Sequence, residues 1–93
     1  MKRRIDEFEW DEGNQYKSLL RHNVTNEEAE EAFFDEYASI YKVREDRRII
    51  LGRSIAGRYL AQIFEFKGPY KVRIISSRDM SASEKRQYRR NVL

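Results

Sequence analysis

The chain has 93 residues, of which 40% are hydrophobic and 13% aromatic, with four glycines, one proline and no cysteine. This length and composition support one small hydrophobic core, so we expect a single domain over residues 1–93. The lack of cysteine excludes a disulfide framework and thiolate metal ligands. Residues 1–10 carry no apolar segment of the signal-peptide kind, and no apolar run approaches the roughly 20 residues that span a bilayer, so we expect no membrane association.

Charge is distributed unevenly along the chain, although its formal net value is only +3. Residues 1–46 hold 7 Lys/Arg and 13 Asp/Glu, a net charge of −6, whereas residues 47–93 hold 12 and 3, a net charge of +9. A C-terminal half this basic favours a polyanionic partner, and nucleic acid is the first candidate. The alternative is that the two halves fold against each other and that their charges partly cancel.

The start of the chain predicts a short strand and a first helix. The strand is expected over residues 8–10, where apolar and polar residues alternate. Asn14 is suited to cap a helix that ends near His22. Leu19 and Leu20 are expected to form the apolar face of that helix.

A second helix is predicted to begin after Thr25. The Thr25 hydroxyl can accept a hydrogen bond from the backbone N–H of Glu28 while the Glu28 side chain reaches back, which is the pattern of a capping box. Val24 and Ala29 have the spacing of a hydrophobic staple. Apolar residues at helical spacing continue to Phe33.

From residue 39 the apolar pattern alternates, as in strands. Links of two or three residues join the four strands, which implies an antiparallel meander because parallel pairs need long crossovers. The final helix opens with a second capping box, Ser81 to Glu84, and is polar nearly all round. The order of elements predicts an α+β fold with an antiparallel meander sheet of four to five strands, two N-terminal helices and one C-terminal helix. The strands are expected over residues 39–44, 47–54, 58–66 and 70–77, and the last helix over residues 82–91.

Five segments, in this order, resemble motifs of the BrnT family of toxins from type II toxin–antitoxin systems. Each motif is weak alone, but together they cover about residues 8–90. The segments are Phe8-Glu9-Trp10-Asp11-Glu12-Gly13-Asn14 with Lys17, His22 with Val24-Thr25, Glu28-Ala29-Glu30-Glu31 with Phe33-Phe34-Asp35, Leu51-Gly52-Arg53-Ser54, and Arg73-Ile74-Ile75-Ser76-Ser77-Arg78 with Ser83-Glu84-Lys85-Arg86 and Tyr88.

The chain departs from the family pattern at two places. Many members carry an Asp-x-x-His-Ser loop between the second helix and the sheet, whereas residues 37–48 here form a shorter stretch without histidine. Many members also have glycine after the histidine that ends the first helix. This chain has Asn23 there, and asparagine tolerates the left-handed conformation that ends a helix.

The resemblance implies a RelE-like fold and a toxin that cleaves mRNA as an endoribonuclease and so arrests translation. It also implies a cognate ribbon-helix-helix (BrnA-like) antitoxin that covers the toxin. That antitoxin would bind operator DNA, so the toxin would meet operator DNA only through its partner. The implied location is the bacterial cytoplasm.

Metal-independent RNA cleavage would use the RNA's own 2′-hydroxyl, and it needs a base, an acid and donors for the charge on the phosphorane. One histidine and no cysteine suit a reaction without metal or cofactor. Arginine suits the charge-stabilising role because its fork matches phosphate geometry. Arg53 and Arg78 are the first catalytic candidates, because small neighbours such as Gly52 and Ser77 would leave room for a substrate backbone. The alternative is that both arginines are solvated strand charges.

His22 and Tyr88 complete the catalytic candidates. His22 could act as base or acid near neutral pH, but a structural role at the end of its helix is favoured. Tyr88 could donate a proton or stack on a base, or it could anchor an otherwise polar helix.

The RNA-binding candidates are basic residues outside that catalytic set. Lys85, Arg86 and Arg89 belong to a basic run in the last helix, which could bind RNA or be the surface that an acidic antitoxin segment covers. Arg73 depends on a strand register that the sequence does not fix. Lys17 could supply charge, although a solvated face of the first helix is favoured.

Two other groups of residues are expected to be structural. Trp10 is predicted to be a core aromatic rather than a base-stacking residue. The glutamates at positions 27, 28, 30 and 31 lie on different faces of a helix, so a solvated surface is favoured over a metal site.

Two further functional classes remain open at this point. The first is a non-catalytic module of the same fold that binds RNA, the ribosome or the antitoxin. The second is a protein–protein module whose toxin activity has decayed.

Overall fold

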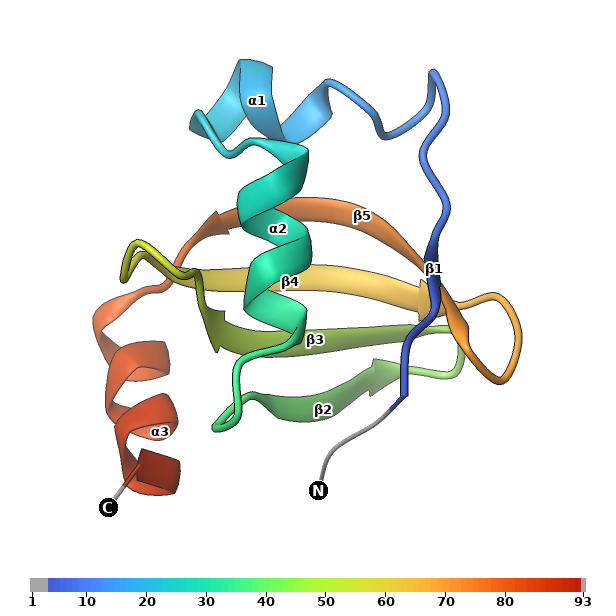
Figure 1. Ribbon diagram of the computed structural model, residues 1–93. Coiled ribbons are helices and arrows are strands. Elements are labelled where there is room, and N and C mark those ends of the chain that lie inside the picture. The colour runs from blue at the N-terminus through green and yellow to red at the C-terminus, as the bar shows by residue number, and fades with distance from the viewer. Residues whose placement is uncertain (1–3, 93) are drawn as a thin grey trace.

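A computed structural model describes residues 4–92, which form a five-stranded sheet and three helices (Figure 1). The strand order in the sheet is β1-β5-β4-β3-β2. No helix in this part of the chain is long and apolar enough to cross a membrane. The elements are β1 (Glu7–Phe8), α1 (Lys17–His22), α2 (Asn26–Phe33), β2 (Ser39–Arg44), β3 (Arg47–Arg53), β4 (Tyr59–Phe66), β5 (Lys71–Asp79) and α3 (Ala82–Val92).

Strands β2 to β5 form the antiparallel meander that the sequence predicts. β1 adds a fifth strand, but it pairs in parallel with β5, and Phe8 lies opposite Val72. A parallel neighbour is possible because a long connection through α1 and α2 separates β1 from the meander. The α+β class is therefore confirmed, and the sheet is mostly rather than wholly antiparallel.

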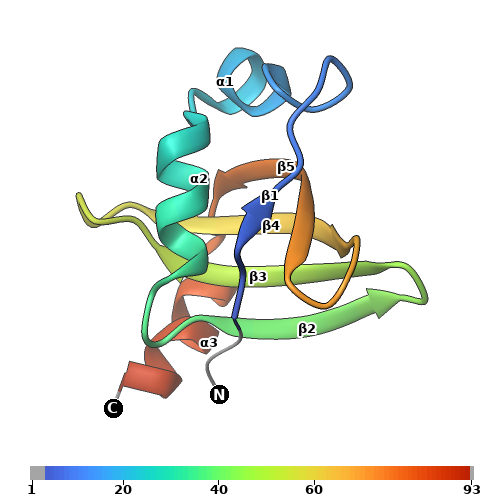
Figure 2. The same ribbon diagram turned by 45° about the vertical axis from the view of Figure 1, so that its right-hand side comes forward.

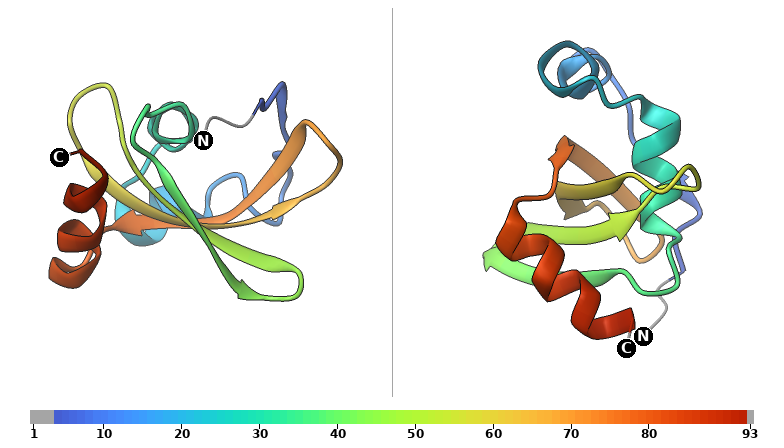
Figure 3. Two further views of the ribbon diagram at one scale, coloured as in Figure 1. Left: turned by 90° about the horizontal axis from the view of Figure 1, so that it is seen from below. Right: turned by 90° about the vertical axis from the view of Figure 1, so that its left-hand side faces the viewer.

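Helices cover the two faces of the sheet unequally. α2 lies over one face (Figure 2), where Ala32 of α2 and Ile50 of β3 belong to the same buried cluster, while α1 lies at the edge of the sheet beside β5. α3 lies at one end of the sheet (Figure 3), where Tyr88 packs with Leu51 and Ala61. The side chains of successive strand residues point to opposite faces of the sheet, so Ile50 and Leu51 belong to different buried clusters. The rest of the second face, called the open face below, carries no helix within residues 4–92.

The predicted caps of α2 are confirmed. The Thr25 hydroxyl accepts a hydrogen bond from Glu28 N at 3.1 Å, and Glu28 Oε1 accepts one from Thr25 N at 3.1 Å. α2 packs closely on β3, because a Cβ atom added to Gly52 would lie 2.2 Å from the carbonyl oxygen of Ala32. This approach of two backbones requires glycine at position 52.

α1 is shorter than predicted and faces the sheet differently. It begins at residue 17, and Asn14 lies outside it, buried, where its amide donates to one backbone carbonyl after β1 and to one in β5. The expected apolar face is wrong, because Leu19 is 42% exposed and Leu20 is 82% exposed. Ser18 is the buried residue, and its hydroxyl accepts a hydrogen bond from β5. Asn23 ends α1 in the left-handed conformation, as predicted.

A β-bulge in β5 changes which side chains face the helices. Ile75 is the extra residue, and it has no register partner in β4. Beyond it, Ser77 is buried and donates its hydroxyl to the side-chain oxygen of Gln62, whose amide donates to the backbone of α2 at 2.8 Å. Arg78 lies opposite Ala61 and therefore points to the open face.

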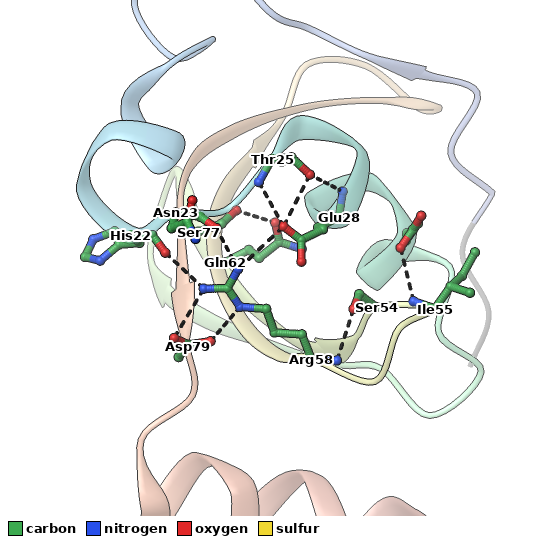
Figure 4. A network of polar contacts seen from close by, with 11 residues as sticks. His22, Asn23, Thr25, Glu28, Ser54, Ile55, Arg58, Gln62, Ser77 and Asp79 are labelled. Carbon is green, nitrogen blue, oxygen red and sulfur yellow. Dashed lines mark hydrogen bonds and ion pairs between the residues drawn. The ribbon is translucent and has the colours of Figure 1, made fainter.

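The guanidinium of Arg58 connects three elements at one end of the sheet (Figure 4). It donates to the carbonyl oxygens of His22 at 2.9 Å and Asn23 at 2.7 Å, where α1 ends. It also pairs with Asp79 of β5 at 2.8 Å and with Glu28 of α2 at 3.5 Å. The hydrogen bond from Arg58 holds the pKa of Asp79 below its ordinary value. These five residues are called the Arg58 network.

We predict that Arg58→Lys lowers the free energy of unfolding by about 2 kcal/mol, because one ammonium group cannot donate to acceptors on three elements at once. Arg44→Lys is the matched control, since Arg44 forms only an exposed pair with Asp46. That control should change stability by less than about 0.5 kcal/mol. Urea denaturation of both variants measures the difference, and equal losses would contradict the role given to the network.

Candidate functional site

Three basic side chains surround the ring of Tyr59, at the end of the sheet where β3 stops and β4 begins. The distances from the ring centroid are 5.2 Å to Arg53 Cζ, 5.6 Å to Lys85 Nζ and 5.7 Å to Arg89 Cζ. None of the three forms an ion pair with a carboxylate of residues 4–92. Arg53, Lys85 and Arg89 are called the cation cluster.

Backbone connections bring the cation cluster together. Arg53 and Tyr59 are register partners across β3 and β4, on the open face of the sheet. The N–H of Met80 donates to the carbonyl oxygen of Tyr59 at 3.1 Å, so α3 starts beside β4. Lys85 and Arg89 are four residues apart in α3 and therefore lie on the same side of that helix.

Tyr88 joins α3 to the sheet below the cluster. Its side chain is buried, and its ring contacts the ring of Tyr59 edge-on, with the centroids 5.7 Å apart. Its hydroxyl donates to Asp35 Oδ2, which also accepts the backbone N–H of Arg53 at 2.8 Å. Burial and this hydrogen bond to Asp35 raise the pKa of Tyr88. The anchoring role that was one of its two predicted roles is therefore present in the structure.

Arg78 lies on the open face but is engaged by α3. Its two terminal nitrogens donate to the two carboxylate oxygens of Glu84 at 2.7 and 3.0 Å. The Glu84 carboxylate also accepts the N–H of Ser81 at 2.8 Å, and the backbone N–H of Glu84 donates to the Ser81 hydroxyl at 3.2 Å, which completes the predicted capping box of α3. The hydrogen bonds from Arg78 hold the pKa of Glu84 below its ordinary value. Arg78 is thus paired with a carboxylate, unlike the three side chains of the cation cluster.

Arg73 is held in the same way, at the opposite part of β5. Its guanidinium donates to both oxygens of Asp11, at 2.7 and 2.9 Å, and to Glu9 at 2.9 Å. The side chain is only 17% exposed. The structure therefore places this RNA-binding candidate in an ion-pair network that joins β5 to the segment after β1.

Three other candidates lie apart from the cluster. The imidazole of His22 points away from the Arg58 network (Figure 4), and its side chain is exposed. Lys17 begins α1, which packs beside β5 at the edge of the sheet rather than on the open face. Arg86 is exposed on α3. Within residues 4–92, none of these three side chains forms a hydrogen bond, ion pair or ring contact with the cation cluster, although Arg86 directly follows Lys85 in α3.

Most of the small residues beside Arg53 and Arg78 have structural contacts and do not leave room for a substrate backbone; only Ser76 lies on the open face without being buried. Gly52 faces α2 rather than the open face. The Ser54 hydroxyl accepts the backbone N–H of Arg58, and Ser77 is fully buried.

Trp10 and the acidic face of α2 have structural contacts. Trp10 packs against the core and donates its indole N–H to Glu30 at 2.6 Å. Glu28 caps its own helix, and Glu31 accepts the backbone N–H of Ile55. Among the described residues, no three ligand-type side chains gather as a metal site requires.

Three residues of this end of the molecule escaped prediction from the sequence: Asp35, Arg58 and Tyr59. Tyr59 carried a usable signal, because counting outward from the predicted turn at residues 55–57 pairs the two strand ends and sets it opposite Arg53. Arg58 and Asp35 form hydrogen bonds with residues that are distant in sequence, and no local sequence pattern predicts such contacts.

A separate pocket of about 250 Å³ lies on the helix-covered side of the sheet. Its lining is mostly apolar and includes Phe33, Ile40 and Phe64, while Asp35 and Glu36 are its ionisable residues. A pocket with acidic groups and no cation is a poor match for a polyanion, so the cation cluster is the stronger candidate site.

The chain is similar to known toxins. A family model described as the ribonuclease toxin BrnT of type II toxin–antitoxin systems matches residues 10–84. The 1.1 Å crystal structure of the Brucella abortus ribonuclease toxin BrnT superposes with a TM-score of 0.67 at 25% identity, covering 81% of this chain and 96% of that chain. No curated protein sequence matches. The family match includes Arg53, Tyr59 and Arg78 and ends at Glu84, so Lys85 and Arg89 lie beyond it.

We predict that Glu84→Gln lowers the free energy of unfolding by about 1–2 kcal/mol at pH 7, because Arg78 loses its charged partner. A carboxylate with a lowered pKa stabilises the fold above its unfolded pKa, near 4.5, and this contribution disappears as the pH falls through the folded value. Urea denaturation at pH 7 and pH 3.5 should therefore show a smaller difference from the unmodified protein at the lower pH. Glu36→Gln, at an exposed site, is the control and should show little difference at either pH.

Proposed function

This chain belongs to the BrnT family of ribonuclease toxins of type II toxin–antitoxin systems, and from that premise we propose that it cleaves RNA at the cation cluster without a metal ion. The observation that carries the proposal is the convergence of Arg53, Lys85 and Arg89 on one ring, while none of the three forms an ion pair with a carboxylate of residues 4–92. Like charges repel, so such a group is costly to assemble unless an anion binds there.

The cluster suits the charge that develops when the 2′-hydroxyl of RNA attacks the adjacent phosphorus. In that step the oxygen–phosphorus bond forms, the 5′-oxygen leaves, and negative charge grows on the phosphorane. Arg53 and Arg89 would donate forked hydrogen bonds to its oxygens, and Lys85 would add a point charge. Arg78 lies beside them and would hold α3 in place through Glu84.

The proton transfers have fewer candidates. The carboxylate of Asp35 is linked to the cluster because it accepts the backbone N–H of Arg53. The same carboxylate already accepts a hydrogen bond from the Tyr88 hydroxyl. Because the pKa of Tyr88 is raised, we propose that Tyr88 positions α3 rather than donating a proton. An acid or base role for His22, and RNA contacts of Arg73, Lys17 and Arg86, stay predictions.

The biological setting follows from the family. A toxin of a type II system acts together with a cognate antitoxin. We propose that this antitoxin is a ribbon-helix-helix protein that covers the cation cluster and alone contacts operator DNA, that the substrate is mRNA, and that cleavage arrests translation in the cytoplasm. The RelE-like character of the fold belongs to the same proposal.

The decisive test is cleavage of a single-stranded RNA oligonucleotide by the purified protein in the presence of a chelator. We expect discrete products at an unchanged rate after metal removal, and none when each nucleotide lacks its 2′-hydroxyl. Arg53→Ala and Arg89→Ala should each lower kcat/KM by about 10- to 100-fold, the cost of a lost charge-assisted hydrogen bond in the transition state.

Arg44→Ala is the control for these variants, because it removes the same charge from β2, outside the cluster, and should leave the rate within about twofold.

A second function, RNA binding without cleavage, is favoured by one observation: Asp35 and Tyr88 hydrogen-bond to each other, so both groups are already engaged. Tight, salt-sensitive binding with no products would support that function and overturn the nuclease proposal. Cleavage that stops on chelation would overturn the metal-independent mechanism alone.

A further inference from the structure

Tyr59 occupies the centre of the cation cluster through both its backbone and its ring. Its backbone pairs with Arg53 across the β3–β4 ladder and accepts the N–H of Met80 at 3.1 Å. Its ring contacts the three cations of the cluster and also the ring of Tyr88, at an interplanar angle of 80°. One residue therefore contacts all three cations of the cluster and Tyr88.

Three arginines outside the cluster are held differently. Arg58, Arg73 and Arg78 are each paired with carboxylates at 2.7–2.9 Å. In the cation cluster, the basic side chains contact the electron-rich ring of Tyr59 instead of carboxylates. A ring attracts a cation by its quadrupole but adds no negative charge, so it holds the side chains without neutralising them.

The same arrangement argues against base stacking on Tyr59. Three cations already lie within 5.7 Å of the ring centroid, and Tyr88 contacts the ring as well. The ring is also only partly exposed. A nucleobase would have to displace the cations that the phosphate needs.

We propose that Tyr59 is a positioning residue that orders Arg53, Lys85 and Arg89 for the phosphate backbone of RNA. This rests on the proposed function of the cluster. Long basic side chains lose rotamer freedom when they bind, and a ring that restrains them before binding removes part of that loss. Tyr59 thus acts through the cations and not on the reacting atoms.

Binding of a 2′-O-methyl RNA oligonucleotide, which cannot be cleaved through its 2′-oxygens, tests the proposal by fluorescence anisotropy at several salt concentrations. Tyr59→Phe keeps the ring and should bind within about twofold of the unmodified protein. Tyr59→Leu should weaken binding by about tenfold. Tyr70→Leu is the matched control, since Tyr70 carries one arginine, Arg4, elsewhere on the sheet, and it should have no effect.

The salt dependence of binding distinguishes a loss of side-chain ordering from a loss of positive charge. Tyr59→Leu removes no cation, so the slope of log affinity against log salt should be nearly unchanged. Arg89→Ala removes one phosphate contact and should reduce that slope by about 0.7. Should Tyr59→Leu fail to fold, pentafluorophenylalanine at position 59 keeps the ring shape but inverts its quadrupole, and it should weaken binding about as much.

Three outcomes decide the matter. Weak binding by Tyr59→Leu and the fluorinated protein, with Tyr59→Phe intact, supports the proposal. Unaffected binding by the leucine and fluorinated variants, with Arg53→Ala and Arg89→Ala weakened, overturns the role of Tyr59 and leaves the proposed function standing. Unaffected binding by the two arginine variants overturns the proposed function itself.

Discussion

The Arg58 network is the interaction on which the placement of the helices depends. One guanidinium satisfies the last carbonyls of α1, meets the capping glutamate Glu28 of α2, and pairs with Asp79 at the end of β5. α3 begins three residues after β5 ends, so the same contact that fixes the helix layer also fixes where α3 starts. The network lies beside the site and not in it, yet it sets the position of two of the three cluster cations.

The β-bulge at Ile75 makes a second contribution. Without the extra residue, strict alternation from Val72 would turn Ser77 toward the open face and Arg78 toward the helices. With it, Ser77 is buried against Gln62, and Arg78 reaches Glu84 on the first turn of α3. The irregularity in the strand therefore places a cation on the side of the sheet where α3 docks.

The sequence predicts the elements better than the contacts between them. Capping boxes at Thr25 and Ser81 mark two helix starts, since their signals lie within four residues, and the alternating pattern and short turns predict the meander. The start of α1 and the parallel pairing of β1 depend on tertiary packing, such as the burial of Asn14, that no local pattern encodes. For the same reason a basic run identifies Lys85 as an RNA candidate, while Tyr59 is revealed only by the strand register.

The uneven charge of the chain gains a physical meaning from these contacts. The acidic first half does cancel part of the basic second half: Asp11 holds Arg73, and Glu28 holds Arg58. This cancellation is selective, because those carboxylates lie on the segment after β1 and on α2, whereas α3 docks at the end of the opposite face. The three cluster cations form no ion pair with a carboxylate of residues 4–92 and contact a neutral ring instead. Partial cancellation and a polyanion site are therefore compatible, since folding pairs Arg58 and Arg73 with carboxylates and leaves the cations of the proposed site unpaired.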